Sequence, residues 1–331
     1  MIKKILMIAG FIIGAVVYAE EVLVWPPPPD QPRIKWVQTV ARIEDMEKEK
    51  GFFSRLFEAI FGEDKKKIIK PMGSYVRGSK LYFTDTGAKG FFIYDTRKKT
   101  VKFIDHIGDY GLSSPVDIAV DKKGRIFVSD SMLGTVFITN EDGEFLGRIG
   151  GGVIIRPTGL AIDDGMNWLY ITDTVAGKIY VISLKDKKLV RKIGKIGVKE
   201  GEFNRPTYIT VDRQGRLYVS DSMNARIQIF DRNGNFLTMF GERGTSIGTF
   251  ANPRGIAVDS DGNIYVSDTL LSAIQIFNIK GELLLVFGNY GTKNGEFAYP
   301  EDITITKNDL IFVSDSYNMR IQVFKYLKGG K

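Results

Sequence analysis

The chain consists largely of short apolar runs separated by glycine-containing turns, and their order is the same from one unit to the next. Each unit opens at a proline with a run such as GIAVD (255–259), followed by a turn such as DSDG (259–262). A run such as IYVSD (264–268), a short loop and a run such as RIQIF (226–230) come next. A second glycine turn leads to an outer run such as FLTMFG (236–241). Because glycine supplies the positive φ that tight hairpins need, the pattern predicts four antiparallel strands per unit.

The unit occurs six times. Its most constant element is an aspartate flanked by Ser or Thr, and consecutive copies of this aspartate are 43 to 48 residues apart. The six aspartates are Asp85, Asp130, Asp173, Asp221, Asp268 and Asp315. A proline precedes each aspartate by 14 to 16 residues, at Pro71, Pro115, Pro157, Pro206, Pro253 and Pro300. A fixed period of this length is typical of solenoids and propellers.

Four antiparallel strands per unit are typical of propeller blades. Blades are covered on both faces by their neighbours, which explains why the runs are continuously apolar instead of alternating. We therefore predict an all-β fold, a six-bladed β-propeller of four-stranded antiparallel blades over residues 71–325, with a tail over 326–331. An open solenoid with two free ends is the competing interpretation.

The outer strand of the last unit is expected from the other end of the sequence. No outer run follows RIQVF (320–324), whereas IKWVQTVAR (34–42) reads as an isolated strand. Within it, WVQTVA from Trp36 fits the outer pattern, with Ala41 in the place of glycine. We expect residues 34–43 to complete the last blade and close the ring. Closure removes an unpaired sheet edge, which a solenoid would keep.

The first residues have the pattern of an export signal. Lys3 and Lys4 precede an apolar run over 5–17 that is too short to span a bilayer comfortably, and VYA ends at Ala19. We predict a signal peptide over 1–19 that is cleaved after Ala19, and therefore an exported protein, periplasmic or extracellular.

Two further segments flank the closing strand. Five prolines between residues 26 and 32 predict a Pro-rich extended arm over 20–33. The interval 44–70 is expected to form an amphipathic helical insertion, with an apolar stripe in GFFSRLFEAIFGE (51–63), and a basic linker, KKKIIK (65–70). Three placements of the helix are open: on the propeller itself, on a partner, or on a membrane surface through residues 51–62.

Composition narrows the range of partners and cofactors. The 331 residues are 44% hydrophobic and 26% charged, which is ordinary for a globular protein. The formal charge of +7 falls to +5 without Lys3 and Lys4, and the basic residues are interleaved with acids, so no nucleic-acid partner is expected. The sequence has no cysteine and one histidine, which excludes disulfides, thiolate metal sites and covalently attached c-type haem.

Two stretches carry a family resemblance. SDSMNARIQIF (220–230) and SDSYNMRIQVF (314–324) resemble the NHL repeat, whereas earlier units such as TDTVAGKIYVI (172–182) depart from it. The segments flanking the closing strand are similar to those of exported bacterial six-bladed NHL propellers. Because such relatives are encoded near periplasmic multihaem cytochromes, the resemblance implies an envelope redox protein as a candidate partner.

The repeat aspartates are expected to be structural. An Asp at the end of a strand accepts hydrogen bonds from loop N–H groups, and Arg226 and Arg320 stand five residues after Asp221 and Asp315, where each can pair with its aspartate. The turn DSDGN (259–263) starts like a calcium loop but lacks the later ligands. No metal and no cofactor are therefore predicted.

An enzymatic role is the alternative to a binding role. The resemblance extends to a zinc-dependent amidating lyase, whose histidine ligands this sequence cannot supply. Related six-bladed folds include calcium-dependent lactonases, which need several oxygen ligands converging on the channel. Asp117 and Asp302, each two residues after a repeat proline, are the only candidates at such positions. A calcium-dependent lactonase or lyase with its site at the central channel remains the alternative, and no catalytic residue is assigned.

The predicted binding surface combines two sets of residues. Three of the six units have Gly two residues after the proline. Larger residues occupy this position in the other units or stand beside it, and we expect them at the mouth of the central channel: Asp117, Tyr208, Arg254, Glu301 and Asp302. The loops after the repeat aspartates should open on the same face with Met132, Leu133, Met223, Leu270, Leu271, Tyr317 and Met319. Exposed apolar residues of this kind favour protein binding, although they could instead pack between blades. We predict a non-catalytic binding or scaffold propeller with a protein partner.

Overall fold

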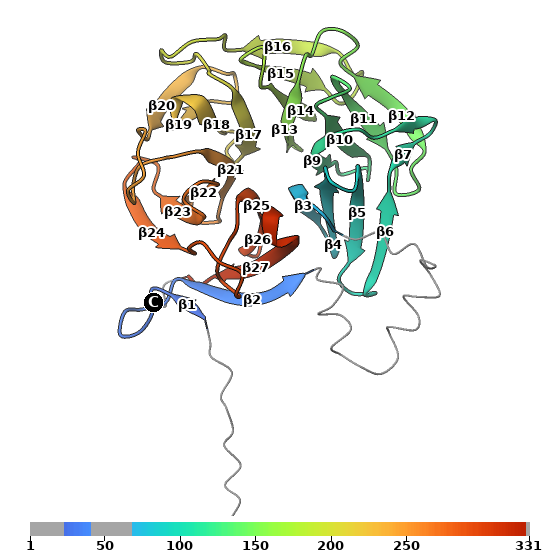
Figure 1. Ribbon diagram of the computed structural model, residues 1–331. Helices are drawn as coiled ribbons and strands as arrows, with labels where there is room; N and C mark the ends of the chain where they lie inside the picture. Colours follow the sequence, from blue (N-terminus) through green and yellow to red (C-terminus); the bar gives the residue numbers. More distant parts are fainter. Residues whose placement is uncertain (1–22, 41–67, 329–331) are drawn as a thin grey trace, which may run out of the picture.

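The computed structural model describes residues 23–40 and 68–328, which form six antiparallel sheets arranged in a ring around a central axis (Figure 1). The predicted six-bladed β-propeller is confirmed. The strands of blades 1 to 3 are β3 (Pro71–Arg77), β4 (Lys80–Asp85), β5 (Gly90–Asp95), β6 (Thr100–Ile104); β9 (Pro115–Val120), β10 (Ile126–Asp130), β11 (Thr135–Thr139), β12 (Phe145–Ile149); β13 (Pro157–Asp163), β14 (Trp168–Asp173), β15 (Lys178–Ser183) and β16 (Leu189–Ile193).

Blades 4 and 5 have the same four-strand order, and blade 6 has an additional strand. The strands are β17 (Pro206–Val211), β18 (Leu217–Asp221), β19 (Arg226–Phe230), β20 (Phe236–Phe240); β21 (Pro253–Val258), β22 (Ile264–Asp268), β23 (Ala273–Phe277), β24 (Leu283–Phe287); β25 (Pro300–Ile305), β26 (Leu310–Asp315), β27 (Arg320–Tyr326), β2 (Ile34–Val40) and β1 (Val24–Trp25). A small hairpin, β7 (His106–Ile107) and β8 (Tyr110–Gly111), and two 3₁₀ turns, η1 (Ser222–Asn224) and η2 (Ser316–Asn318), complete the described elements.

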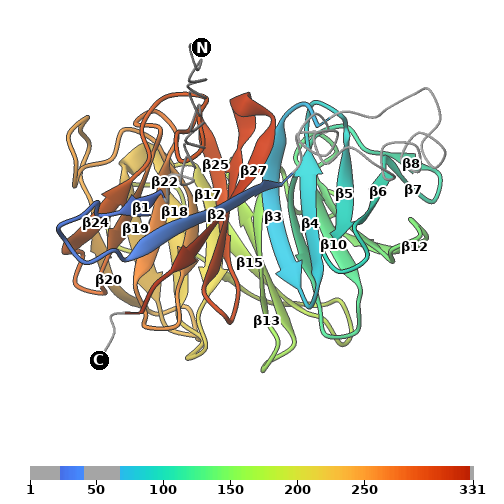
Figure 2. The ribbon, with the colours of Figure 1, turned by 90° about the horizontal axis from the view of Figure 1, so that it is seen from below.

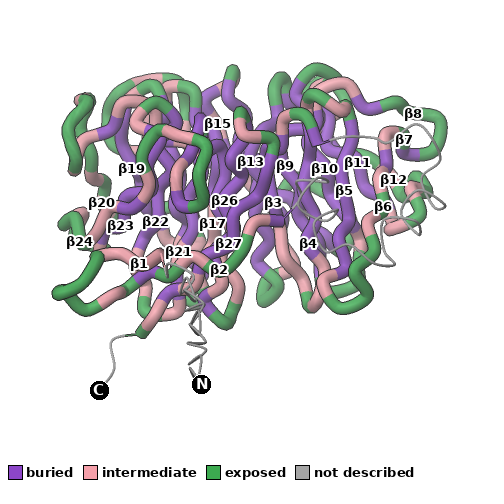
Figure 3. The backbone as a smooth tube through the Cα atoms, turned by 60° about the horizontal axis from the view of Figure 1, so that its bottom comes forward, coloured by how far each residue is buried: buried purple, intermediate pink, exposed green. Residues whose placement is uncertain are grey.

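The repeated proline and aspartate define the same end of every blade. The proline opens the innermost strand and the aspartate closes the next one, so the two are cross-strand partners, as Pro300 and Asp315 are in blade 6. The hydrophobic core lies between blades rather than inside one sheet. Tyr170 and Ile179 of blade 3, for example, share a cluster with Leu217 and Val219 of blade 4. Figure 3 shows the buried strands enclosed between the exposed turns of the two faces.

The N-terminal strand closes the ring as predicted. β2 runs antiparallel to β27 on its outer side (Figure 2), with Trp36 opposite Phe324 and Val40 opposite Ile321. The pairing skips Val37, and the outer strands of blades 2 to 5 skip one residue at the corresponding position, for example Leu284 in blade 5. β2 therefore reproduces both the register and the β-bulge of an ordinary outer strand.

The proline-rich segment is not the extended arm that its composition predicts. β1 pairs antiparallel with β2, and the N–H of Arg33 donates to the carbonyl of Trp25 at 2.7 Å, so residues 24–34 fold back as a hairpin. The Trp25 ring packs against Phe287 and Phe324, at centroid distances of 5.7 and 5.8 Å. Partial burial of this indole against blades 5 and 6 offsets the local preference of prolines for an extended chain.

Several predictions lie outside the described residues. These are the signal peptide (1–19), nearly all of the insertion and basic linker (44–70), and the end of the tail (329–331). Within the described residues, no helix has the length and apolar character needed to cross a membrane.

Candidate functional site

The Ser/Thr-Asp-Ser/Thr motif holds the loops at one face of the propeller. The Asp130 carboxylate accepts hydrogen bonds from the N–H groups of Ser113, Ser114, Met132 and Leu133, which lie before and after it along the chain. These bonds fix the loop after the aspartate and the connection from the preceding blade at the same end of the ring. We call this end, formed by the loops after the aspartates and by the connections between blades, the loop face.

The flanking hydroxyl groups join neighbouring blades. In blade 3, Thr172 donates to the carbonyl of Thr207, and Thr174 donates to the carbonyl of Pro206 at 2.8 Å, both on the innermost strand of blade 4. In blade 2, Ser129 donates to the carbonyl of Thr158 on blade 3 at 2.6 Å. The motif is therefore explained by blade assembly.

In two blades an arginine extends this network. Arg320 Nε lies 2.7 Å from Asp315 Oδ2, and the same guanidinium donates to the carbonyls of Thr292, Lys293 and Glu296 in the connection before blade 6. Arg226 makes the corresponding bonds to Asp221 and to the connection before blade 4. Burial raises the pKa of both aspartates, although their arginine partners oppose this effect.

The residues two positions after each proline form one layer around the central axis of the propeller. Around the ring, glycine alternates with a larger residue: Gly73, Asp117, Gly159, Tyr208, Gly255 and Asp302. A Cβ on Gly159 would lie 2.7 Å from the Cα of Tyr208, and one on Gly255 would lie 2.5 Å from the Cα of Asp302. Each glycine therefore provides the space that the next blade needs to approach.

These larger residues do not lie at an open mouth, contrary to the sequence prediction. Asp117, Tyr208 and Asp302 are no more than 5% exposed, because the alternate glycines let them pack across the axis. The adjacent layer toward the loop face is also filled, by the residues directly after the prolines: Met72, Val116, Thr158, Thr207, Arg254 and Glu301. Arg254 and Glu301 form an ion pair there at 2.9 Å, and only Arg254 is partly exposed. The channel is closed at the loop face.

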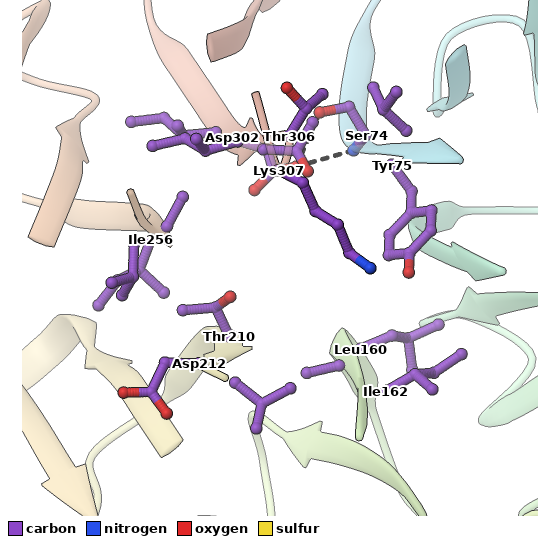
Figure 4. A pocket seen from close by; sticks show the side chains of 18 of the residues that line it. Ser74, Tyr75, Leu160, Ile162, Thr210, Asp212, Ile256, Asp302, Thr306 and Lys307 are labelled. Carbon is purple, nitrogen blue, oxygen red and sulfur yellow. Dashed lines mark hydrogen bonds between the residues drawn. The ribbon is translucent and has the colours of Figure 1, made fainter. Parts of the chain in front are cut away.

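From this layer a cavity of about 580 Å³ extends along the axis to the opposite face (Figure 4). Its walls come from all six innermost strands, with aliphatic side chains such as Leu160 and Ile256. Its opening lies among the turns between the first and second strands, where Arg77 pairs with Asp164 at 2.9 Å and Lys307 is exposed. We call this end the turn face.

The two channel aspartates connect neighbouring blades at the cavity floor. Asp302 Oδ2 accepts hydrogen bonds from the backbone N and the Oγ of Ser74 in blade 1, at 2.7 and 3.2 Å. Asp117 Oδ2 accepts from the N–H of Leu160 in blade 3 at 2.7 Å, and its Oδ1 accepts from the N–H of Ile118 at 2.8 Å. Both carboxyl groups line the cavity.

The floor stabilises protonated carboxyl groups. Burial raises the pKa of Asp302 to about 7. Burial also raises the pKa of Asp117, and the nearby charge of Asp302 raises it further. The pKa of Tyr208 is raised by burial and then by the charge of Asp302. At neutral pH the pair therefore carries less than its full negative charge, and a positive group at this point would be favoured.

The channel does not fit the calcium site of a lactonase. Among the described residues, no three His, Asp or Glu side chains come together in a way that could hold a metal ion. Calcium takes about six to eight oxygen ligands, whereas the partners identified around these two carboxyl groups are mainly backbone N–H donors. We therefore derive no step through a calcium ion.

The loop face carries most of the exposed apolar side chains. Of the predicted residues, Met132, Met223, Leu270 and Tyr317 are 48 to 72% exposed, and Leu271 is half-buried. Leu133 and Met319 are exposed too. The connections between blades add a set that the sequence analysis missed: Ile69, Val153, Ile155, Ile196, Val198, Ile247, Tyr290 and Tyr299. The one feature of the sequence that could have indicated these residues is that apolar side chains recur in the connection after each outer strand.

Basic residues outnumber acidic ones among the exposed charges of this face. The basic residues are Lys89, Arg156, Lys195, Lys199, Arg205, Arg243 and Lys293. The acidic residues are Asp109, Glu200 and Glu242. The predicted residues thus fall into two places, an exposed loop face and a buried layer behind it.

Fold and site together define a six-bladed NHL-type β-propeller whose channel, as formed by the described residues, opens at the turn face. The chain belongs to the SMP-30/gluconolactonase/LRE-like family, whose model matches residues 60–247. The NHL repeat matches residues 250–277 and 297–324.

Curated relatives match only part of the chain. The "Probable peptidyl-alpha-hydroxyglycine alpha-amidating lyase pgal-1" of Caenorhabditis elegans is 29% identical over 107 residues, which are 31% of this chain and 30% of that protein. Protein brain tumor of Drosophila melanogaster is 43% identical over 61 residues, 18% of this chain and 6% of that protein. The matches thus span less than a third of these relatives.

Solved structures share the fold at low identity. Virginiamycin B lyase from Staphylococcus aureus superposes with a TM-score of 0.58 at 14% identity, over 79% of this chain and 96% of that one. An auxiliary nutrient binding protein from Bacteroides thetaiotaomicron gives a TM-score of 0.61 at 15% identity, over 78% of this chain and 69% of that one. At these identities the likeness concerns the fold alone.

Proposed function

We propose that this protein is an exported binding propeller whose loop face docks another protein. The observation that carries the proposal is the concentration of exposed Met, Leu, Ile and Tyr side chains on that face. Met132 is 72% exposed and Tyr290 is 73% exposed. Apolar and aromatic side chains gathered on one surface are typical of protein-binding sites.

The charge of the face indicates the character of the partner. Seven exposed basic residues against three acidic ones surround the apolar side chains. Complementary charge steers association and orients the partner. The partner we propose is therefore a protein with an acidic surface around an apolar centre, and an envelope redox protein is one candidate of this kind.

The structural comparisons support a binding role, and the sequence supports export. Two of the similar solved structures are described as auxiliary nutrient binding proteins of Bacteroides species. The proposal of export rests on the pattern of residues 1–19. Sequencing the amino terminus of the protein recovered from the native envelope tests this part, and a mature chain that still begins at Met1 would contradict cleavage.

The docking face is tested by charge insertion. Leu270→Glu combined with Tyr317→Glu changes two exposed loop-face residues, and Leu284→Glu, exposed on the outer strand β24, is the matched control. We expect wild type and the control to retain one envelope protein that the double variant loses, and we expect salt to weaken its binding. Equal retention by all three proteins would reject the loop face.

A lactone hydrolase acting at the channel is the second candidate. It is favoured by the family match and by the buried carboxyl pair, in which the pKa of Asp302 is about 7, suited to general acid or base catalysis near neutral pH. Hydrolysis of D-glucono-1,5-lactone faster than the uncatalysed reaction, and lost in Asp302→Asn, would establish this function instead.

A further inference from the structure

We propose that the central channel binds a small ligand with a primary ammonium group, which lies between Asp117 and Asp302 at the channel floor, and an apolar body along the channel walls. This site is independent of protein docking at the loop face, because the channel opens only at the turn face. A channel ligand and a loop-face partner can therefore bind at the same time.

No cationic side chain among the described residues lines the floor of the cavity. Asp117 and Asp302 both line the cavity, and the one cation beside them, Arg254, lies in the adjacent layer and pairs with Glu301. The cationic residues that line the cavity itself are at its opposite end: Arg77, Arg213 and Lys307. Lys307 lies in the turn that follows β25, which ends at Ile305, whereas Asp302 lies inside that strand.

The hydrogen-bonding groups suit an ammonium ion. An alkylammonium group has three N–H donors and no acceptor. Each carboxylate oxygen that accepts one backbone N–H keeps a second lone pair. The Tyr208 side chain also lines the cavity and is 2% exposed, and its hydroxyl lies beside the Arg254 guanidinium, which bonds to one side of the oxygen. The second lone pair of this oxygen is a third acceptor.

Two carboxylates and one hydroxyl are too few for calcium, which takes about six to eight oxygen ligands, but they match the three donors of an ammonium group. The next layer of the cavity toward the turn face is aliphatic. It consists of Ile118, Leu160, Ile209, Ile256 and Ile303, with Ser74 as the polar exception. A carbon chain attached to the ammonium group would therefore contact aliphatic side chains. The cavity volume of about 580 Å³ lies within the usual range of small-molecule sites.

Protons should compete with the ammonium group of the ligand for the buried carboxyl groups. Burial raises the pKa of Asp302 to about 7, so below neutral pH a proton neutralises the carboxyl group that the ammonium needs. The pKa of Asp117 is also raised, so a falling pH neutralises this carboxyl group as well. Among the other charged groups that face the cavity, Arg77 and Asp164 neutralise each other at the turn face. Amine affinity should therefore rise as the pH increases from 6 to 8.

The test is calorimetric titration of the whole protein with n-hexylamine, and with 1-hexanol and hexanoate as probes of equal chain length. We expect saturable binding of one hexylamine per chain at pH 8 and weaker or no binding of the other two probes. Asp117→Asn and Asp302→Asn should each weaken hexylamine binding about 10- to 100-fold, because each removes a charged acceptor. Asp164→Asn, at the turn-face opening, should change it less than about twofold.

Thermal unfolding of each variant separates loss of the site from loss of the fold, and only variants that unfold cooperatively are compared. Binding of hexanol as tight as that of hexylamine would overturn the proposal, as would equal affinity in wild type and in both Asn variants. Stoichiometric calcium binding that displaces hexylamine would also overturn it. Because loop-face capture uses a different surface and assay, failure of either proposal leaves the other open to its own test.

Discussion

Asp302 of the last blade accepts two hydrogen bonds from Ser74 of the first blade. These bonds join blade 6 to blade 1 at the channel floor, where the carboxyl group is buried. A group that closes the ring on the inside is therefore also a titratable group, and the stability of the ring depends on its protonation.

We predict that the protein is more stable at pH 5.5 than at pH 8. Because the pKa of Asp302 rises from its ordinary 3.8 to about 7 on folding, the folded state binds this proton more tightly than the unfolded state. The free energy of unfolding therefore falls as the pH rises from about 4 to 7, by up to about 4 kcal/mol. Asp302→Asn should flatten this dependence in urea unfolding measured at several pH values. A wild-type stability that increases with pH over this range would contradict the assignment.

The closing strand should make a large contribution to stability. Trp36 is partly buried against the cluster of blade 6 and pairs with Phe324. Trp36→Ala should lower the free energy of unfolding by about 2 to 4 kcal/mol. Val37, the neighbouring bulge residue, is 42% exposed, so Val37→Ala should cost less than about 0.5 kcal/mol. Equal urea midpoints for the two variants would show that β2 is not held in this register.

Arg320 should be the main attachment of the connection before blade 6. Arg320→Met leaves Asp315 buried with its arginine partner removed and frees three carbonyl groups. Loss of one partner of a buried ion pair typically costs about 3 to 5 kcal/mol. Limited proteolysis should then cleave first within residues 288–299. Lys293→Met, an exposed change in the same connection, is the control and should leave both stability and cleavage unchanged.

The alternate glycines of the axial layer should tolerate no side chain. Gly159→Ala would place a Cβ 2.7 Å from the Cα of Tyr208, so the inner strands of blades 3 and 4 would have to move apart. We expect a loss of at least about 1 to 3 kcal/mol in thermal or urea unfolding. Gly165→Ala meets only the Asp163 carboxylate at 3.1 Å, and its effect should be clearly smaller. Similar losses for the two variants would show that close approach of the blades is not the reason for Gly159.

The repeat pattern was sufficient to predict the architecture because the number of aspartates sets the number of blades. The match of WVQTVA to the outer strands also predicted that this segment completes the last blade, where the structure places Val40 opposite Ile321. The sequence could not predict how deeply a given side chain is buried in the folded propeller. Whether Asp117 lies at a mouth or inside the axis depends on glycines in other blades, and the docking of Trp25 depends on a surface built from Phe287 and Phe324.

The apolar residues of the connections were missed for a related reason. Ile196 and Ile247 lie in segments without strand or helix periodicity, so their sequence gave no indication of which side they face. Their position follows from bonds made elsewhere, such as the Asn204 N–H that donates to Asp221.

The pairing of β2 with β27 has a consequence for biosynthesis. Residues 34–40 leave the ribosome early, but apart from the two-residue strand β1 their partner is β27, which is complete only when residues 320–326 have been made. Contacts this distant in sequence slow folding, and an unpaired strand is exposed to aggregation in the interval. We therefore expect the free edge of β2 to need protection from aggregation until translation is nearly finished.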